Sequence, residues 1–568
     1  MFSLSLTGTA AFAAEIKYSD IVIGDSELSE TGENAASDNA KVIQVAFDEA
    51  KNKASDKNRY RIYFPKGEYH INTTLNIFSN TELYLDEKTT LVQDAPKGQN
   101  IVKAGDFSQK HILYNGFRNI KIDGGKWDMQ FNGSCAMRFG HCTNLSISNV
   151  HITNIKDAHH IEAAAVDTLS ITDSTFTSSL RRGSNSCEAI QLDILHDSKH
   201  FPGFEEFDDT PNKNVTISGC TFSNLHSGIG TRSAVVSKYF DNVVIENNKF
   251  ENIQEKAISC FNYKNSKIIN NTFTNVNSGI CFEYLPNNFF KNDYSQRMYI
   301  ANDKSIGKIN SKSSTVISGN VMNIKQMAKS SYGIYAYGAK VDASTAKANG
   351  IVAGDYTISD LSIDNNTITV EEKSPKSYGI YITGVNKSEI SSNILTDDYS
   401  SAEDGINGIN ICASQKNVIK NNNIPGSKNL LITSNSISGV KSFGIRVAES
   451  SYATIKSDNN ISAGESPLCL YSQNYSQNVP TPSVKSKGYS LRNKPLIRFS
   501  SLNGSAGYKV SRSAYNGTFK EIATVYGENL NFEDKSSSAF SKNYYRVTPI
   551  YNVGGTIVTG KNYIDIAF

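Results

Sequence analysis

The middle of the chain repeats a short pattern, and this repeat constrains the fold more than any other feature. A run of alternating β-branched residues leads into polar turn residues and then into one large apolar residue, at Ile152, Phe176, Phe222, Phe250 and Phe273. The steps between these residues are 24, 46, 28 and 23. A period in the low twenties with occasional insertions is typical of a solenoid, whose coils stack along one axis.

Each unit also contains a second strand of the form x-Gly/Ala-Ile-x, seen in EAIQLD, SGIGTR, KAISCF and SGICFE. Three short strands per coil with Asn-rich turns predict a parallel β-helix, whose backbone hydrogen bonds join coils about 4.8 Å apart. Asn tolerates left-handed backbone and can bond to its neighbours up and down the stack. The absence of an L-x-x-L-x-L frame excludes leucine-rich repeats, and the short period argues against a propeller.

Length and charge exclude several other classes. A chain of 568 residues is too long for one compact core, so an elongated repeat or several domains are required. Its 57 basic and 55 acidic residues leave a formal charge of +2, which predicts no nucleic-acid or anionic-membrane partner. No apolar run is long enough to span a membrane. Eight cysteines without a C-x-x-C pair predict neither a disulfide scaffold nor a structural zinc site.

The ends of the chain differ from the repeat. Residues 1–14 form a short apolar stretch that ends in Ala-Phe-Ala, which predicts a signal peptide and a secreted or cell-surface protein. We expect the β-helix over residues 15–473, a Pro/Ser/Asn/Lys-rich linker over 474–495 and a small β-sandwich over 496–568. Apolar residues on one face predict a helix over Asp38–Ala50, with Asp38 as N-cap, that covers the first coil. We expect a monomer.

Four segments carry a resemblance to a known family: AKVIQVAFDEA, YFPKGEYHI, SNTELYLDEKTTLV and NIKIDGGKWD. In this order they resemble the start of the pectate-lyase and polygalacturonase β-helix superfamily, over about residues 38–278. The resemblance implies a right-handed β-helix and an activity on polysaccharide, and does not choose between hydrolase and lyase. The polygalacturonase motifs Asn-Thr-Asp, Asp-Asp, Gly-His-Gly and Arg-Ile-Lys are absent from the corresponding coils, where EAIQLD and SGIGTRSA stand instead.

The C-terminal segment is similar to a fibronectin type III module. Gly507–Val510 resembles the third strand of that module and Tyr544–Val547 its sixth, with Phe499 where the family usually carries a buried Trp. The resemblance implies a spacer, or a unit that docks the protein to a cell wall or surface. No chemistry is expected there.

The pleat of the x-Gly/Ala-Ile-x strands predicts where a site lies. If each Ile faces the core, the residues at positions +1 and +3 from it face outward, as does the −2 residue where the strand begins at a bend. Charges of both signs collect in these columns between residues 138 and 283 and then give way to tyrosines. We therefore predict catalytic residues Glu162, Glu188, Asp193 and Arg232, and substrate-binding residues Arg138, His159, Gln191, His196, Lys256, Glu283 and Tyr335.

Spacing favours one mechanism for this wall. Glu162 and Asp193 lie one coil apart and are offset by two residues, which puts their Cα atoms about 8 Å apart. Inverting glycosidases hold their carboxyl groups about 6.5–9.5 Å apart, so that one protonates the leaving oxygen while the other activates water. Arg232 and Lys256 would hold an acidic, pectin-like sugar. The prediction is a hydrolase acting on an acidic polysaccharide.

Two alternatives use the same wall. In a lyase, Ca²⁺ held by Glu162, Glu188, Asp193 and Asp209 would neutralise a uronate, and Arg232 or Lys256 would abstract the proton. In a surface adhesin, the wall would bind carbohydrate without cleaving it. For all three we expect two long inserts, residues 196–213 and 287–311, to border the cleft, and tyrosines such as Tyr335 to stack on sugar rings.

Overall fold

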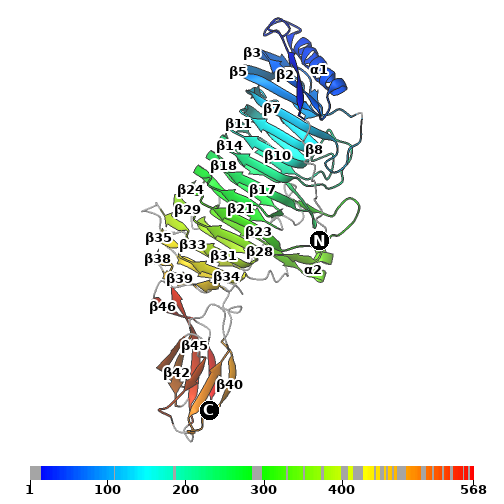
Figure 1. Cartoon of the computed structure of the whole chain (residues 1–568). Helices are drawn as coiled ribbons and strands as arrows, with labels where there is room; N and C mark the ends of the chain where they lie inside the picture. Colours follow the sequence, from blue (N-terminus) through cyan, green and yellow to red (C-terminus); the bar gives the residue numbers. More distant parts are fainter. Residues whose placement is uncertain are drawn as a thin grey trace, which may run out of the picture.

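A computed structural model gives the architecture of the chain. It describes residues 15–568 except 108, 183–186, 285–296, 326, 328–329, 350–351, 372–376, 398–406, 413–426, 441–442, 448–452, 456–457, 464–465, 470–481, 501–506, 515–516, 527–529, 538–541, 554–555 and 561–562. The predicted signal peptide, residues 1–14, lies outside the described residues. Figure 1 shows a long stack of coils with a helix at one end and a small β domain at the other.

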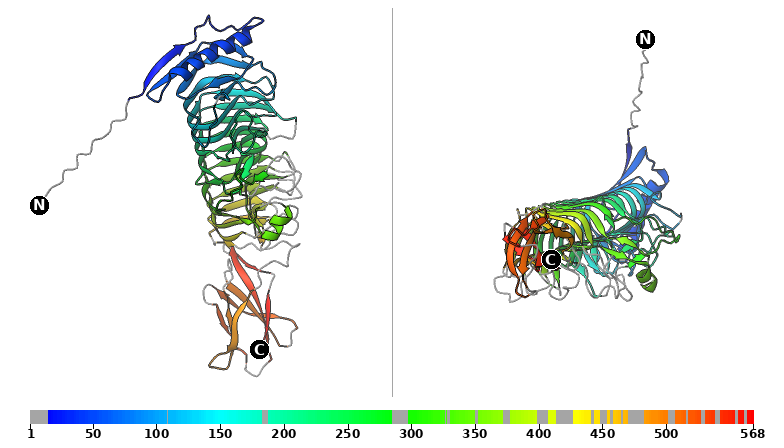
Figure 2. Two further views of the ribbon diagram at one scale, coloured as in Figure 1. Left: turned by 90° about the vertical axis from the view of Figure 1, so that its right-hand side faces the viewer. Right: turned by 90° about the horizontal axis from the view of Figure 1, so that it is seen from below.

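The stack is the predicted all-β parallel helix. Among the described residues, thirty-five strands are joined by hydrogen bonds, and the pairings between successive coils are parallel. The coils have three walls. Several long strands bend at a corner, so that their two ends belong to different walls. Figure 2 shows the stack from the side and along its axis.

The first wall carries the x-Gly/Ala-Ile-x strands. Its members are β4 (Leu75–Ile77), β6 (Val102–Ala104), the starts of β8 (Met137–Ser148) and β10 (Ile161–Thr172), β12 (Glu188–Asp193), β15 (Ser227–Gly230), the ends of β18 (Lys249–Phe261) and β21 (Thr272–Glu283), β25 (Ser331–Tyr337), β30 (Ser377–Thr383), β33 (Asn407–Cys412), β36 (Phe443–Val447) and β39 (Ser466–Cys469).

The second wall continues from the ends of β8 and β10. Its other members are β1 (Lys17–Val22), β2 (Asn58–Phe64), β5 (Thr81–Gln93), β7 (Phe117–Asp128), β13 (Lys213–Ser218), β17 (Phe240–Glu246), β19 (Tyr263–Lys264), β20 (Lys267–Ile269), β23 (Lys312–Ser318), β28 (Ile358–Asp364), β31 (Val385–Ser391), β34 (Lys428–Thr433) and β37 (Ala453–Ile455).

The third wall closes the coil. It contains β3 (Gly67–Ile71), the ends of β5 and β7, β9 (His151–Lys156), β11 (Thr175–Leu180), β14 (Thr221–Leu225), the starts of β18 and β21, β24 (Val321–Lys325), β29 (Thr367–Glu371), β32 (Ile394–Asp397), β35 (Ser436–Val440) and β38 (Asn460–Ala463).

Equivalent residues of successive coils stack on one another in the interior. The first-wall isoleucines pair in register from Ile161 to Ile190 and on to Ile229, and all are buried. On the third wall, Phe176, Phe222, Phe250 and Phe273 stack with ring centroids 4.7–5.0 Å apart. These are the large apolar residues that close each sequence repeat, so the repeat pattern is the pattern of the core.

A ladder of buried asparagines crosses seven coils at the turn between the second and third walls. It runs through Asn248, Asn271, Asn320, Asn366, Asn393, Asn435 and Asn459. In each of the first six, the backbone N–H and the side-chain Nδ2 both donate to Oδ1 of the next Asn. The predicted bonding of turn asparagines along the stack is confirmed. The ladder satisfies backbone groups that the turn would otherwise leave buried and unpaired.

The capping helix is longer than predicted. α1 spans Ala35–Lys53 and buries Ile43, Ala46 and Phe47 against the first coils. The prediction of Asp38 as N-cap is wrong, because the helix begins one turn earlier and Asp38 lies in its first turn. There its negative charge still suits the positive end of the helix dipole.

The C-terminal module has two sheets around its own core. One sheet contains β40 (Val484–Tyr489), β41 (Pro495–Phe499) and β44 (Asn531–Glu533). The other contains β42 (Gly507–Ser513), β43 (Lys520–Tyr526), β45 (Tyr544–Val553), β46 (Thr556–Thr559) and β47 (Ile564–Ala567). Because β40 pairs with β41, the module begins inside the segment that we predicted as linker. Its fibronectin type III resemblance stays a prediction.

Inserts leave the coils at fixed corners. Residues 194–212 follow β12, and β16 (Ser233–Val235) pairs with β22 (Arg297–Tyr299) in a separate two-stranded sheet. A third insert carries β26 (Ala339–Val341), α2 (Ala343–Asn349) and β27 (Gly354–Tyr356). All three follow first-wall strands, so they are placed to cover that wall.

The Asn ladder should be a main source of stability. Replacing Asn271 by Ala removes the acceptor of the Asn248 N–H and the donor to the Ile245 carbonyl, both of which are buried. At about 1–3 kcal/mol for each stranded group, we expect a loss of at least about 2 kcal/mol in chemical denaturation followed by circular dichroism. Asn265→Ala is the matched control, since Asn265 bonds to Asp241 in an exposed turn. Equal effects of the two substitutions would contradict the assigned role of the ladder.

Candidate functional site

The strand register aligns the outer residues of the first wall as the sequence predicted. Arg138 pairs with Glu162, Glu162 with Gln191, and Gln191 with Gly230. The same column continues through Ser259, Cys281, Tyr335 and Tyr381. The charged residues of this part of the sequence therefore do share one wall.

A pocket of about 200 Å³ lies where this wall meets the first insert. Four of the predicted site residues line it: Arg138, His159, Glu162 and Arg232. The insert adds Lys199, His200 and Pro202, and the turns before β6, β8 and β10 add Asn100, Ser134, Cys135 and Asp157. The remaining predicted residues do not line this pocket.

Glu162 and Arg138 form a buried ion pair. Nε of Arg138 lies 2.6 Å from Oε2 of Glu162, and the side chains are only 12% and 2% exposed. Arg138 also donates to the carbonyl of Pro202 in the insert. Burial acts to lower the pKa of Arg138, but the Glu162 carboxylate overrides it and raises that pKa. The pair is electrically neutral and ties the insert to the wall.

Asp193 is completely buried behind the pocket. Its Oδ1 accepts the backbone N–H groups of Ile194 and Ser233, at 2.9 and 3.2 Å, and its Oδ2 accepts Nε2 of Gln191 at 2.7 Å. The same Gln191 nitrogen lies 3.5 Å from Oε1 of Glu162. The Gln191 amide thus stands between the two carboxylates that the hydrolase hypothesis pairs.

Glu188 shows how the −2 position turns outward. It shares its strand parity with the buried Ile190, yet its side chain lies over Gly230 on the outer column. A Cβ at position 230 would collide with Glu188, so the glycine makes room for the carboxylate. His159 lies 3.5 Å from Oε2 of Glu188, and that buried oxygen accepts no hydrogen bond from the described residues.

Arg232 differs from the other cations of the wall. It is half-buried at the pocket, and no hydrogen bond or ion pair joins it to any residue that the structure describes. Its guanidinium still acts on Asp193 and His200 through space, lowering the pKa of each. It is a cation within reach of a ligand and without a fixed partner.

Three predicted ligand-binding residues belong to other clusters. Nζ of Lys256 lies 3.5 Å from Oε1 of the buried Glu283, and the two residues belong to the two coils that follow the coil of Arg232. Tyr335 packs in an aromatic cluster with Tyr332, Tyr378 and Tyr381, and only 5% of it is exposed. The ring faces that were predicted to stack on sugars are mostly occupied by one another.

The first insert is held to the wall by apolar packing and to the second insert by hydrogen bonds. Phe201 packs with Ala164, and Phe204 lies so close to Gly140 that a Cβ there would clash. Nδ1 of His196 pairs with Asp209, while Asn302 of the second insert binds Asp209 and the carbonyl of His196. His196 therefore fastens the two inserts together. Part of the second insert, 287–296, lies outside the described residues.

The structure does not assemble the predicted calcium ligands. Glu162 pairs with Arg138, Asp193 accepts backbone N–H groups, and Asp209 pairs with His196 inside the insert. Across the described part of the chain, no three His, Cys, Asp or Glu side chains converge on a metal-sized space. These carboxylates do not converge, because each of the three is held by a different partner in the wall or in the insert.

Sequence reasoning missed several pocket residues. Asn100, Ser134 and Asp157 lie in the turns that precede first-wall strands, whereas the predictions came from strand positions and from the insert. Lys199 lies in the insert, and its signal was the stretched repeat period that marks residues 196–213. The pocket is therefore formed as much by turns and by the insert as by the strands of the wall.

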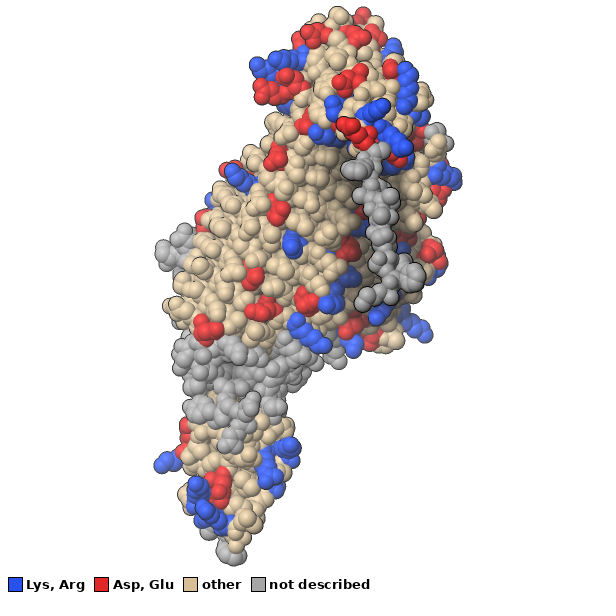
Figure 3. Space-filling view, in the orientation of Figure 1, with Lys and Arg blue, Asp and Glu red and all other residues tan. Residues whose placement is uncertain are grey.

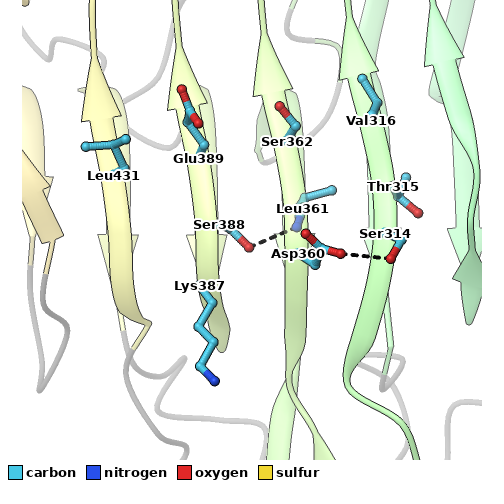
Figure 4. Close-up of a pocket in the computed structure, with 10 residues that line it drawn as sticks. All are labelled: Ser314, Thr315, Val316, Asp360, Leu361, Ser362, Lys387, Ser388, Glu389 and Leu431. Atoms are coloured by element: carbon cyan, nitrogen blue, oxygen red, sulfur yellow. Dashed lines mark hydrogen bonds between the residues drawn. The ribbon is translucent and has the colours of Figure 1, made fainter.

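A wider groove of about 530 Å³ lies on the second wall, over β23, β28, β31 and β34 (Figure 4). Its floor includes Val316, Ser362 and Leu431, with Lys387 and Glu389 along the same strand. These two charged side chains are exposed, so water screens them. Figure 3 likewise shows charges that are scattered over the middle of the visible face and dense around the capped end. The buried charges of the first-wall pocket form the more specific site.

Comparison with known proteins identifies the fold. Residues 31–258 match the family described as "Rhamnogalacturonase A/epimerase, pectate lyase-like", and residues 209–368 match "Right handed beta helix region". The predicted right-handed handedness and the resemblance to pectate lyases are thus confirmed. Neither match reaches the C-terminal module.

One curated relative is "Plasmin and fibronectin-binding protein A" of Streptococcus pneumoniae, 26% identical over 321 residues. The alignment covers 50% of this chain and 43% of the relative, so the chain spans less than half of that protein's length. The crystal structure of PfbA, a surface adhesin of the same organism, aligns with a TM-score of 0.52 and 18% identity over 89% of this chain and all of that one. A second PfbA structure aligns with a TM-score of 0.50 and 17% identity over 80% and 97%. At this level of identity, the similarity to the two PfbA structures shows a shared fold and nothing further.

The Glu162–Arg138 pair should be essential for stability. Glu162→Gln leaves the Arg138 guanidinium buried without its counter-charge, and we expect a loss of about 3–5 kcal/mol in urea denaturation. Asp56→Asn is the matched control, because the Asp56–Arg118 pair is about half exposed and such pairs contribute at most about 1 kcal/mol. A loss for Glu162→Gln no larger than that of the control would show that the pair is not structural.

Proposed function

We propose that this chain, a right-handed parallel β-helix of the pectate-lyase-like class, is a secreted or cell-surface protein that binds an acidic polysaccharide in the first-wall pocket. Arg232 is the observation that carries the proposal. Its half-buried guanidinium lines the pocket and has no partner among the described residues. A guanidinium that makes no hydrogen bond within the described protein keeps its N–H donors available for an anionic ligand.

The charges around Arg232 favour an anionic ligand. Arg138 and Glu162 cancel one another, and Asp157 accepts the backbone N–H of Arg182. Lys199 and His200 approach the pocket from the insert. A sugar carboxylate matches the guanidinium in bidentate geometry, and sugar hydroxyls can bond to Asn100 and Ser134.

The relatives support a binding role at a cell surface. PfbA, which shares this architecture, is described as a surface adhesin, and a curated relative is named for binding plasmin and fibronectin. Among the described residues no helix is both long and apolar enough to cross a membrane. Export together with retention by the C-terminal module would place the first-wall pocket outside the cell.

Hydrolysis is the second candidate, and the state of Asp193 favours it. Burial raises the pKa of Asp193 to about 7, as a general acid requires. The unpartnered Oε2 of Glu188 could act as the base. Against this stands the complete burial of Asp193 beneath Gln191, since an acid must reach the leaving oxygen.

Arg232→Ala tests the binding site. We expect wild-type protein to bind tetragalacturonate in calorimetry at low salt and the variant to bind at least about tenfold more weakly, because one charge-assisted hydrogen-bonding group contributes about 1.5–3 kcal/mol. Arg118→Ala, which removes an arginine beside Asp56, should bind like wild type. Failure of wild type to bind, or unchanged binding by Arg232→Ala, would overturn the proposal.

Glu188→Gln separates binding from cleavage. If the pocket only binds, wild type releases no reducing sugar from polygalacturonate, and no unsaturated uronate absorbance appears. Substitution of Glu188 then changes binding alone. Release of reducing ends by wild type, abolished in Glu188→Gln and in Asp193→Asn, would replace the adhesin assignment with the hydrolase.

A further inference from the structure

The buried Asp193 carboxyl adjoins the unpaired Arg232 without forming an ion pair with it. Ser233, the residue after Arg232, donates its backbone N–H to Oδ1 of Asp193. This contact fixes the backbone of residue 232 beside the carboxyl, while the guanidinium lines the pocket. The two groups interact through space, because Arg232 lowers the pKa of Asp193.

The charge of the cluster depends on this one carboxyl. Glu162 and Arg138 form a neutral pair. With Asp193 ionised, its charge offsets that of Arg232, and the cluster is neutral. With Asp193 protonated, the cluster carries one positive charge, located at the pocket. An anionic ligand therefore meets a more favourable field when Asp193 holds a proton.

We propose that the pocket takes up a proton on Asp193 together with the anionic sugar at Arg232. The inference deepens the proposed function and rests on it. The step is a protonation of the carboxylate by solvent, coupled to binding of one sugar carboxylate, with no covalent change.

The Gln191 amide is built to accept either state. In the ionised state its Nε2 donates to Oδ2 of Asp193, and its buried Oε1 has no partner among the described residues. A half-turn of the amide places Oε1 against Oδ2, where it accepts the new O–H of Asp193. Nε2 then leaves Asp193, which no longer needs that donor. Gln191 thus supplies an acceptor that is unused until the proton arrives.

The titration of Asp193 falls in a useful range. The pKa of this carboxyl is raised to about 7, mainly by burial and also by the nearby Glu162, while hydrogen bonds from the Ile194 N–H and Gln191 and the charge of Arg232 oppose the rise. An anion bound at Arg232 would partly cancel the Arg232 charge. Binding would therefore raise the pKa of Asp193 further. Affinity should be highest below about pH 7 and fall above it, because above that pH binding requires proton uptake.

Other ionisable groups lie near Asp193. Tyr263, whose pKa burial raises well above its usual value, stays neutral. His200 lines the pocket, and burial lowers its pKa, so the His200→Gln variant serves to measure its share. His159 also lines the pocket, 3.5 Å from the Glu188 carboxylate. The carboxylates of the probe are ionised throughout.

Calorimetry with tetragalacturonate at pH 6 and pH 8 tests the coupling. We expect wild type to bind about fivefold more tightly at pH 6 than at pH 8, as a one-unit rise in a pKa of about 7 on binding requires. Titrations at pH 8 in two buffers of different ionisation enthalpy should show uptake of about 0.4 proton per ligand bound. Asp193→Asn, a neutral isostere, should bind with the pH 6 affinity at both pH values, whereas His200→Gln should keep the wild-type ratio.

The outcomes are distinguishable. Absence of wild-type binding at both pH values would overturn the proposed function and the coupling with it. Wild-type binding without proton uptake at pH 8, or an Asp193→Asn variant that keeps the wild-type pH dependence, would overturn the coupling alone. The buffer measurement needs no variant, so it decides the question even if Asp193→Asn fails to fold.

Discussion

Backbone hydrogen bonding between successive coils, in one register, is the constraint on which the rest of this molecule depends. It places each residue directly above its equivalent in the coil before, so that columns rather than single residues are the units of structure. Inside, like side chains stack into the isoleucine, phenylalanine and asparagine columns. Outside, the same register brings together polar and charged side chains that are 24–29 positions apart in the chain, such as Arg138, Glu162 and Gln191.

The inserts convert an outer wall into a pocket. Small residues in one outer column, Gly140 and Ala164, accept the phenylalanines of the first insert, which then covers the neighbouring Asp193. When an insert covers a charged wall, it excludes water from the charged side chains. A buried charge without a counter-charge is strongly destabilising, so most of these charges form ion pairs. Arg138 pairs with Glu162, and Lys256 pairs with Glu283. Arg232 lines the pocket without a hydrogen bond or ion pair to any described residue, and we propose that an anionic ligand pairs with it there.

The columns could be predicted from the sequence, because equivalent positions of successive repeats are the residues that pair between successive coils. The coil period, the inward isoleucines and the stacked turn asparagines all follow from residue spacing, and so does the alignment of Arg138 with Glu162. Spacing did not reveal burial. Asp193 stands in an outward column, yet it is enclosed because residues far along the chain fold back over it. Partner choice was equally hidden: His196 was predicted to bind substrate and instead fastens one insert to the other.

The proposed function requires that an acidic sugar binds at Arg232 in the insert-walled pocket. A crystal structure of the protein soaked with tetragalacturonate would show where the sugar lies. We expect density in that pocket, with a sugar carboxylate within hydrogen-bonding distance of the Arg232 guanidinium. A sugar bound instead in the open groove over Ser362 and Glu389, with the Arg232 pocket holding only water, would contradict it.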